Sequence, residues 1–140
     1  KTAHRRRNIP IAFHTGRDPL SPNLVHCPPD QLAQVAETFP KLTIIAAHMG
    51  GMDMPQEAAK HLAGKPNVYF DTAFVSHFLT SAQLGELIQL HGADRVLFAT
   101  DCPWSTVPAE RELLLAAGLS PADLERVAYR NAEELFGITV

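Results

Sequence analysis

The sequence predicts an α/β fold in which four parallel β-strands alternate with α-helices. Each predicted strand is a short apolar run bounded by residues that break regular structure. Apolar and polar residues hardly alternate within these runs, which is typical of strands that are covered on both faces. The predicted strands are residues 9–14, 42–48, 68–71 and 95–101. Because helical segments separate them, the strands are expected to be parallel and joined by right-handed crossovers.

The segments between the strands repeat apolar residues with the period of an α-helix. Leu32, Val35 and Phe39 form one such stripe. Ser120 is expected to cap a helix that begins at the following proline, and Asn131 to cap the last helix. The predicted helices are residues 29–39, 55–63, 81–90, 110–117, a helix that starts after residue 120, and 131–136.

The length of the chain bears on the architecture. A closed (β/α)8 barrel of the TIM type takes about 250 residues, whereas this chain has 140. Four parallel strands alone would also leave two unpaired edges, which proteins usually cover. We therefore interpret residues 1–140 as a single partial domain, about half of a TIM-type barrel.

Composition argues against several classes of function. The net charge is −3 and the pI is about 6.1, so no nucleic-acid surface is expected. No apolar run approaches the roughly 18–20 residues of a membrane span, and the first residues lack the apolar stretch of a secretory signal. The two cysteines, Cys27 and Cys102, make no disulfide framework. A cytoplasmic protein with a small-molecule substrate is the expectation.

Each predicted strand ends in an ionisable residue, namely His14, His48, Asp71 and Asp101. A buried apolar strand has no structural need for such an ending, because these side chains are costly to desolvate. The carboxyl ends of parallel strands share one side of a sheet, where ligands bind in α/β proteins. Histidine and carboxylate ligands suit zinc, iron or manganese. A flavodoxin-like binding module, with acidic strand ends that hold magnesium or phosphate, stays open as an alternative.

Four short motifs resemble the amidohydrolase-related family, which includes aminocarboxymuconate-semialdehyde decarboxylase. They are Phe-His-Thr-Gly at 13–16, Ala-His-Met-Gly-Gly at 47–51, Phe-Ala-Thr-Asp-Cys-Pro-Trp at 98–104 and Asn-Ala-Glu-Glu-Leu-Phe-Gly at 131–137. The resemblance implies that the chain is the C-terminal half of the barrel, strands 5 to 8 with their helices. It implies that His14 is a metal ligand. His48 is then a catalytic histidine or a second metal ligand, and Asp101 is a metal ligand and general base. The implied cofactor is a divalent metal, with zinc as the first choice.

The sequence departs from the family in one respect. The family carries a His-x-His pair on strand 1, and no such pair occurs in this chain. The sequence therefore predicts an incomplete metal site. It also predicts a partner, which is either a second copy of the chain or a complementary N-terminal half.

The expected activity is metal-dependent hydrolysis of a small carbonyl, amide, ester or lactone substrate. Metal-activated water would attack the substrate, Asp101 would transfer the proton and His48 would stabilise the oxyanion. Arg17, Asp71 and Trp104 are candidate substrate contacts. Asp71 could instead bind backbone amides, and Trp104 could instead pack on the rim. The alternatives are a non-oxidative decarboxylase of the same family and a non-catalytic half-barrel fragment.

Overall fold

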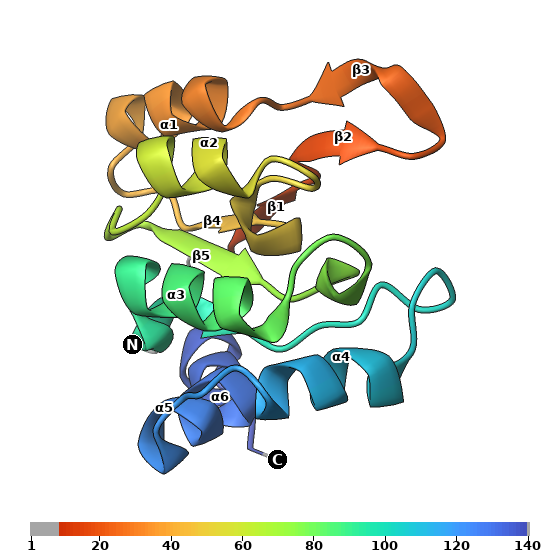
Figure 1. Cartoon of the computed structure of the whole chain (residues 1–140). Helices are drawn as coiled ribbons and strands as arrows, with labels where there is room; N and C mark the ends of the chain where they lie inside the picture. Colours follow the sequence, from red (N-terminus) through yellow and green to blue (C-terminus); the bar gives the residue numbers. More distant parts are fainter. Residues whose placement is uncertain (1–8, 140) are drawn as a thin grey trace, which may run out of the picture.

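A computed structural model describes residues 9–139, so residues 1–8 and 140 of the predicted domain lie outside the described residues. The four strands of the parallel sheet alternate with helices along the chain as predicted, and a hairpin that was not predicted follows the first of them (Figure 1). The strands are β1 (Ile11–Phe13), β2 (Gly16–Asp18), β3 (Ser21–His26), β4 (Ile44–Ala46), β5 (Val68–Asp71) and β6 (Val96–Leu97). The α-helices are α1 (Pro29–Thr38), α2 (Pro55–His61), α3 (Ser81–His91), α4 (Val107–Leu115), α5 (Pro121–Glu125) and α6 (Asn131–Phe136). Shorter turns of helix are η1 (His48–Gly50), η2 (Val75–His77), η3 (Ala93–Arg95) and the π-helical η4 (Arg126–Arg130).

Four strands form one parallel sheet in the order β1-β4-β5-β6. The strands thus stand side by side in chain order, as they do in the wall of a barrel. The register aligns Phe13 with Ala46, Ala46 with Phe70, and Phe70 with Val96. The sheet confirms the predicted parallel α/β fold.

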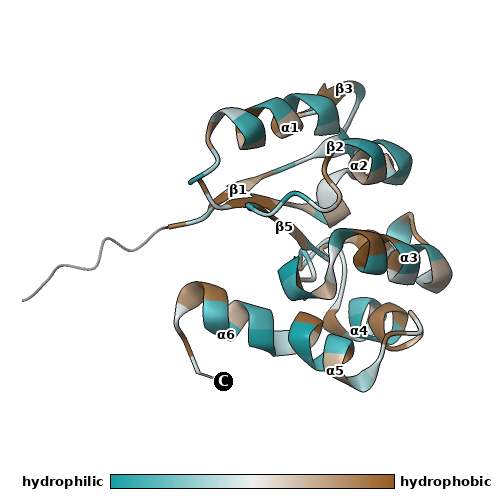
Figure 2. Ribbon diagram, turned by 90° about the vertical axis from the view of Figure 1, so that its left-hand side faces the viewer, coloured by the Kyte–Doolittle hydropathy of each residue, from teal (hydrophilic) through white to brown (hydrophobic). Residues whose placement is uncertain are grey.

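The core lies between this sheet and helices α1, α2 and α3, which cover one of its faces (Figures 1 and 2). Ile44, Val68, Phe70 and Val96 of the strands are fully buried there. The first strand differs from the others, because Ile11 is 46% exposed and Ile9, just before it, is 76% exposed. An apolar edge strand is therefore open to solvent.

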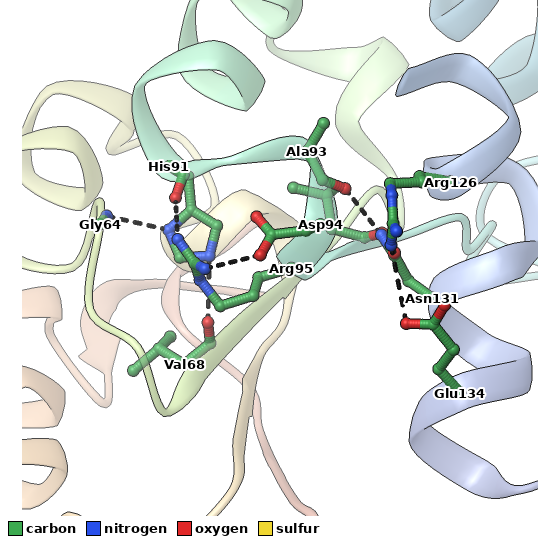
Figure 3. A network of polar contacts seen from close by, with 10 residues as sticks. Gly64, Val68, His91, Ala93, Asp94, Arg95, Arg126, Asn131 and Glu134 are labelled. Atoms are coloured by element: carbon green, nitrogen blue, oxygen red, sulfur yellow. Dashed lines mark hydrogen bonds and ion pairs between the residues drawn. The ribbon is translucent and has the colours of Figure 1, made fainter. Parts of the chain in front are cut away.

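Two polar side chains close the side of the sheet where the strands begin (Figure 3). A ring nitrogen of His91, Nε2, lies 3.0 Å from the carbonyl oxygen of Val68, and the backbone N–H of Gly64 donates to its Nδ1 at 3.2 Å. Asn131 donates through Nδ2 to the carbonyl oxygens of Ala93 and Val96, at 2.7 and 2.8 Å. These bonds tie helices to the starts of β5 and β6.

The expectation that Asn131 caps the last helix is wrong. Its backbone is helical, and α5, η4 and α6 follow one another without a break. The side-chain Nδ2 donates to carbonyls at the start of β6 and Oδ1 accepts from Nη1 of Arg126, so neither atom caps the first turn of α6. Ser120 does cap α5, by accepting from the backbone N–H of Asp123 at 3.1 Å.

The last strand is shorter than the predicted 95–101, because other groups replace the strand pairing after Leu97. The N–H of Phe98 donates to the carbonyl of Val127 in η4 at 2.9 Å. The hydroxyl of Thr72 accepts from the N–H of Ala99 and donates to its carbonyl, both at 2.9 Å. Within residues 9–139, no helix is long and apolar enough to cross a membrane.

Candidate active site

The hairpin β2–β3, the turn after β5 and the loop before α4 all lie on the side of the sheet where the strands end (Figure 1). His14 follows β1, His48 follows β4, Asp71 ends β5, and Asp101 lies in the loop after β6.

The structure brings His14 and His48 into contact. Their ring centroids are 4.8 Å apart, with the rings edge to face. His48 is buried, at 3% exposure, whereas 41% of the His14 side chain is exposed. The backbone fixes this pair, because the N–H of Ala47 donates to the carbonyl of Phe13 at 3.0 Å and the Thr15 hydroxyl donates to the carbonyl of Ala47.

Asp71 orients His48. One carboxylate oxygen of Asp71 accepts from the backbone N–H of His48 at 2.9 Å and from that of Ala73 at 3.1 Å. The ring Nδ1 of His48 lies 2.8 Å from the carbonyl oxygen of Ala73. A carbonyl only accepts, so Nδ1 carries the hydrogen and Nε2 of the neutral ring keeps its lone pair. Burial raises the pKa of Asp71, against the two backbone N–H bonds and His48, which lower it.

The hairpin β2–β3 was not predicted from the sequence. It brings a third histidine, His26, close to His14. Gly16 pairs with His26 in the hairpin, and the ring of His26 lies 5.4 Å from that of His14, centroid to centroid. The Nε2 atom of His26 is buried and has no hydrogen-bond partner among the described residues. His26 stands twelve residues after His14 in the sequence, and only the turn of the hairpin, which the Asp18-Pro19 sequence could have suggested, brings the two together.

The electrostatics of the three histidines favour a neutral His14. Burial lowers the pKa of His14, and His48 and His26 lower it further. Asp18, whose Oδ2 lies 3.9 Å from Nε2 of His14, and Asp101 raise this pKa. A neutral imidazole is the form that binds a metal.

Asp101 and Trp104 lie together at a pocket of about 210 Å³. The N–H of Trp104 donates to the carbonyl of Asp101 at 2.9 Å, in a turn that begins with a left-handed Asp101 at φ 59°. Trp104 is 62% exposed. The pocket is lined by His14, Asp18, Pro19, Leu20, Met52, Phe74, Asp101 and Trp104.

Arg17 lies apart from the other candidates. It lines a neighbouring pocket of about 520 Å³, which shares Asp18, Pro19, Met52 and Phe74 with the first. The hairpin passes close to the η1 loop here, because a Cβ on Gly16 would lie 2.3 Å from the backbone nitrogen of Met52. The site thus brings together His14, His48, Asp101 and Trp104, with Asp71 behind His48 and Arg17 at its border.

The donor types of this site suit a divalent metal, because two imidazoles and a carboxylate are common ligands of zinc and manganese. The structure supplies some of these ligands, but not a complete set. Within residues 9–139, no three histidine, cysteine, aspartate or glutamate side chains are placed so that they could hold one metal ion.

A family model described as amidohydrolase matches residues 3–138 of the chain. The chain belongs to the amidohydrolase family. Gamma-resorcylate decarboxylase of Polaromonas sp. (strain JS666 / ATCC BAA-500) is 27% identical to this amidohydrolase over 117 residues, which cover 71% of this chain and 36% of the relative.

Solved structures confirm the barrel fold. A dihydroxybenzoic acid decarboxylase from Polaromonas sp. JS666, with bound manganese and the inhibitor 2-nitroresorcinol, superposes with a TM-score of 0.67 and 20% identity, over 93% of this chain and 50% of that one. An uncharacterised TIM-barrel protein from Bordetella bronchiseptica gives a TM-score of 0.75 and 26% identity, over 94% and 46%. The amidohydrolase chain spans about half the length of these structures, and its four parallel strands are part of a TIM barrel.

Proposed function

We propose that this chain supplies part of the active site of a metal-dependent, non-oxidative decarboxylase that acts on a small hydroxylated aromatic carboxylate. The observation that carries the proposal is that His14 and Asp101 line one small pocket that follows parallel strands, with the ring of His48 in contact with His14. The relatives whose activities are named, gamma-resorcylate decarboxylase and dihydroxybenzoic acid decarboxylase, support this reaction over the hydrolysis that the sequence suggested first.

His14 and Asp101 would hold the metal, and the lone pair on Nε2 of His48 would face the metal or its substrate. When bound, the metal would polarise the oxygen atoms of the substrate and stabilise the negative charge that develops on them. The solved relative contains manganese, and zinc accepts the same donors. Further ligands would come from outside residues 9–139, from an N-terminal half or from a second copy.

The pocket residues suit an aromatic acid. Phe74 and Trp104 can stack against a ring, and Leu20 and Met52 add apolar surface to the pocket lining. In the reaction, the bond between the ring carbon and the carboxylate breaks, carbon dioxide leaves, and the ring carbon takes up a proton. Asp101 lies at the pocket and would deliver that proton from its carboxyl group.

Hydrolysis of an ester, amide or lactone remains the second candidate, because the family includes hydrolases by its description. In hydrolysis, the same side chains would activate a water molecule instead of protonating a ring carbon. A carboxylate at the position of Asp101 is required by both reactions.

The test is the release of resorcinol and carbon dioxide from gamma-resorcylate in excess Mn²⁺, followed by liquid chromatography, with the full-length or reconstituted form of the protein in which the metal site is complete. Asp101→Asn should lower the rate by about 100-fold or more, since general acid catalysis contributes that much. The circular dichroism spectrum should stay unchanged. Asp94→Asn is the matched control, because Asp94 pairs with Arg95 at the other side of the sheet. Hydrolysis of a lactone without decarboxylation of any hydroxybenzoate would overturn the proposal.

A further inference from the structure

A carboxylate is buried behind the pocket, where the proposed reaction does not use it. Glu110, in the first turn of α4, has no exposed surface. An isolated buried carboxylate is costly, so its partners have to compensate for the lost water. These partners indicate what the residue does.

Three donors converge on Glu110 from two loops. Its Oε1 accepts from the hydroxyls of Ser76 and Ser105, each at 2.6 Å. Its Oε2 accepts from the backbone N–H of Ser76 at 3.0 Å. Ser76 is thirty-four residues away in the sequence, so the bonds join distant segments. The two hydroxyls lie 3.4 Å from each other.

Each of the two loops contributes a residue that lines the pocket. Ser76 belongs to η2 and stands two residues after Phe74, and Ser105 follows Trp104 directly. Phe74 and Trp104 line the same pocket. Ser105 also closes the turn that begins at Asp101, because its N–H lies 3.4 Å from the carbonyl of Asp101.

The backbone of both loops contains conformations that persist only with support from neighbouring residues. Phe74 and Asp101 have φ values of 63° and 59°, in the left-handed region that residues other than glycine rarely occupy. Such conformations persist where the surrounding structure over-determines them. The bonds to Glu110 act within two residues of Phe74 and within four of Asp101.

We propose that Glu110 is a positioning residue, which holds the η2 loop and the loop before α4 at a fixed separation and so sets the distance between the Phe74 and Trp104 walls. It acts through Ser76 and Ser105 and does not touch the substrate. The inference rests on the proposed function only in the choice of ligand for this pocket. A residue that served stability alone would leave ligand affinity unchanged.

The experiment uses Trp104, the single tryptophan of the chain, as the reporter. Its fluorescence is titrated with 2-nitroresorcinol in the presence of Mn²⁺, and its steady-state anisotropy is measured without ligand. The variants are Ser105→Ala and, as a second perturbation of the same cluster, Glu110→Gln. Asn67→Ala is the matched control, since Asn67, just before β5, donates to the carbonyls of Ala36, Phe39 and Leu42 between α1 and β4, and does not line the pocket.

We expect Ser105→Ala and Glu110→Gln to weaken 2-nitroresorcinol binding about tenfold and to lower the anisotropy of Trp104, because the wall is no longer held at its position. Asn67→Ala should lower the melting temperature and leave both readings unchanged. Equal affinity and equal anisotropy in all folded variants would overturn the positioning role. If 2-nitroresorcinol fails to quench the wild-type chain, its binding depends on the metal ligands that lie outside residues 9–139, and the proposed function is then tested on the full-length or reconstituted form. In that case the anisotropy difference between Ser105→Ala and Asn67→Ala alone decides the role of Glu110.

Discussion

His91 should make the stability of this protein sensitive to mild acid. The ring is 1% exposed, stacks on Phe70 with centroids 3.8 Å apart, and bonds to the backbone at both nitrogens (Figure 3). Gly64 donates to Nδ1, so Nδ1 is unprotonated and Nε2–H donates to Val68. Protonation of Nδ1 would break the bond from Gly64 and bury a charge.

The magnitude follows from the pKa. Burial, assisted by the charge of Arg95, lowers the pKa of His91 from 6.5 to about 4. Between these values the unfolded chain binds a proton that the folded chain does not, so stability falls as the pH falls from about 6.5 to about 4 and is then level. At about 1.4 kcal/mol for each pKa unit, His91 should remove about 3 kcal/mol of stability over this window.

His91→Gln tests this value, because a glutamine side chain can accept at one atom and donate at the other without titrating. We expect the variant to be about 1 kcal/mol less stable at pH 7.5, owing to lost ring stacking. Near pH 4 we expect it to be more stable than the wild type by about 2 kcal/mol, so the two stability curves should cross.

Urea unfolding followed by circular dichroism, at intervals from pH 7.5 to 4, measures both curves. Other titrating groups contribute equally to the two proteins and cancel in the difference. His77→Gln is the control, because His77 is exposed and should leave the wild-type slope intact. Parallel curves for the wild type and His91→Gln would refute the argument.

Three further outcomes are expected. The chain alone should bind Zn²⁺ weakly and substoichiometrically after dialysis, because no three donors of residues 9–139 are arranged round one ion; tight one-to-one binding in calorimetry would contradict this. Sedimentation at low micromolar concentration should show a dimer or larger assembly, or partly unfolded chain, because the β1 edge exposes Ile9 and Ile11; a compact, cooperatively melting monomer would show that the open edge is stable. Gly16→Ala should destabilise the fold by about 2–4 kcal/mol in urea melts, because its Cβ would meet the backbone of Met52 at 2.3 Å; a loss below about 1 kcal/mol would show that the loops can separate.

Hydrophobic patterning was sufficient to predict the elements of the parallel sheet. The helices α1, α3 and α5 begin where proline and capping residues placed them, as Thr80 and Ser120 show by accepting from backbone N–H groups. Strand length was less predictable. The apolar run continues to Ala99, yet the hydroxyl of Thr72 and the backbone of η4 replace strand partners after Leu97.

The sequence was sufficient to predict the positions of the candidate residues that follow strands. Parallel strands in chain order place His14 and His48 side by side, and the loop after β6 returns Asp101 to them. His26 and Glu110 could not be found in this way. The first depends on a hairpin with irregular register, and the second on bonds to Ser76 across thirty-four residues, which leave no periodic signal in the sequence.

Backbone strain distinguishes the two sides of the sheet. In the described chain, residues other than glycine with positive φ all lie in segments that follow strands, and they are Cys27, His48, Met49, Asp53, Phe74 and Asp101. Glycine takes positive φ on both sides, at Gly92 and Gly137 where helices end and at Gly16 and Gly50 after strands. Where a turn alone is needed, glycine adopts it without steric cost. Keeping imidazole, carboxylate and phenyl groups in strained turns costs stability, so these side chains must serve something that a glycine turn would not. Phe74 and Asp101 line one pocket, and His48 contacts His14 of the same lining, so the strained backbone and the proposed site lie on the same side of the sheet.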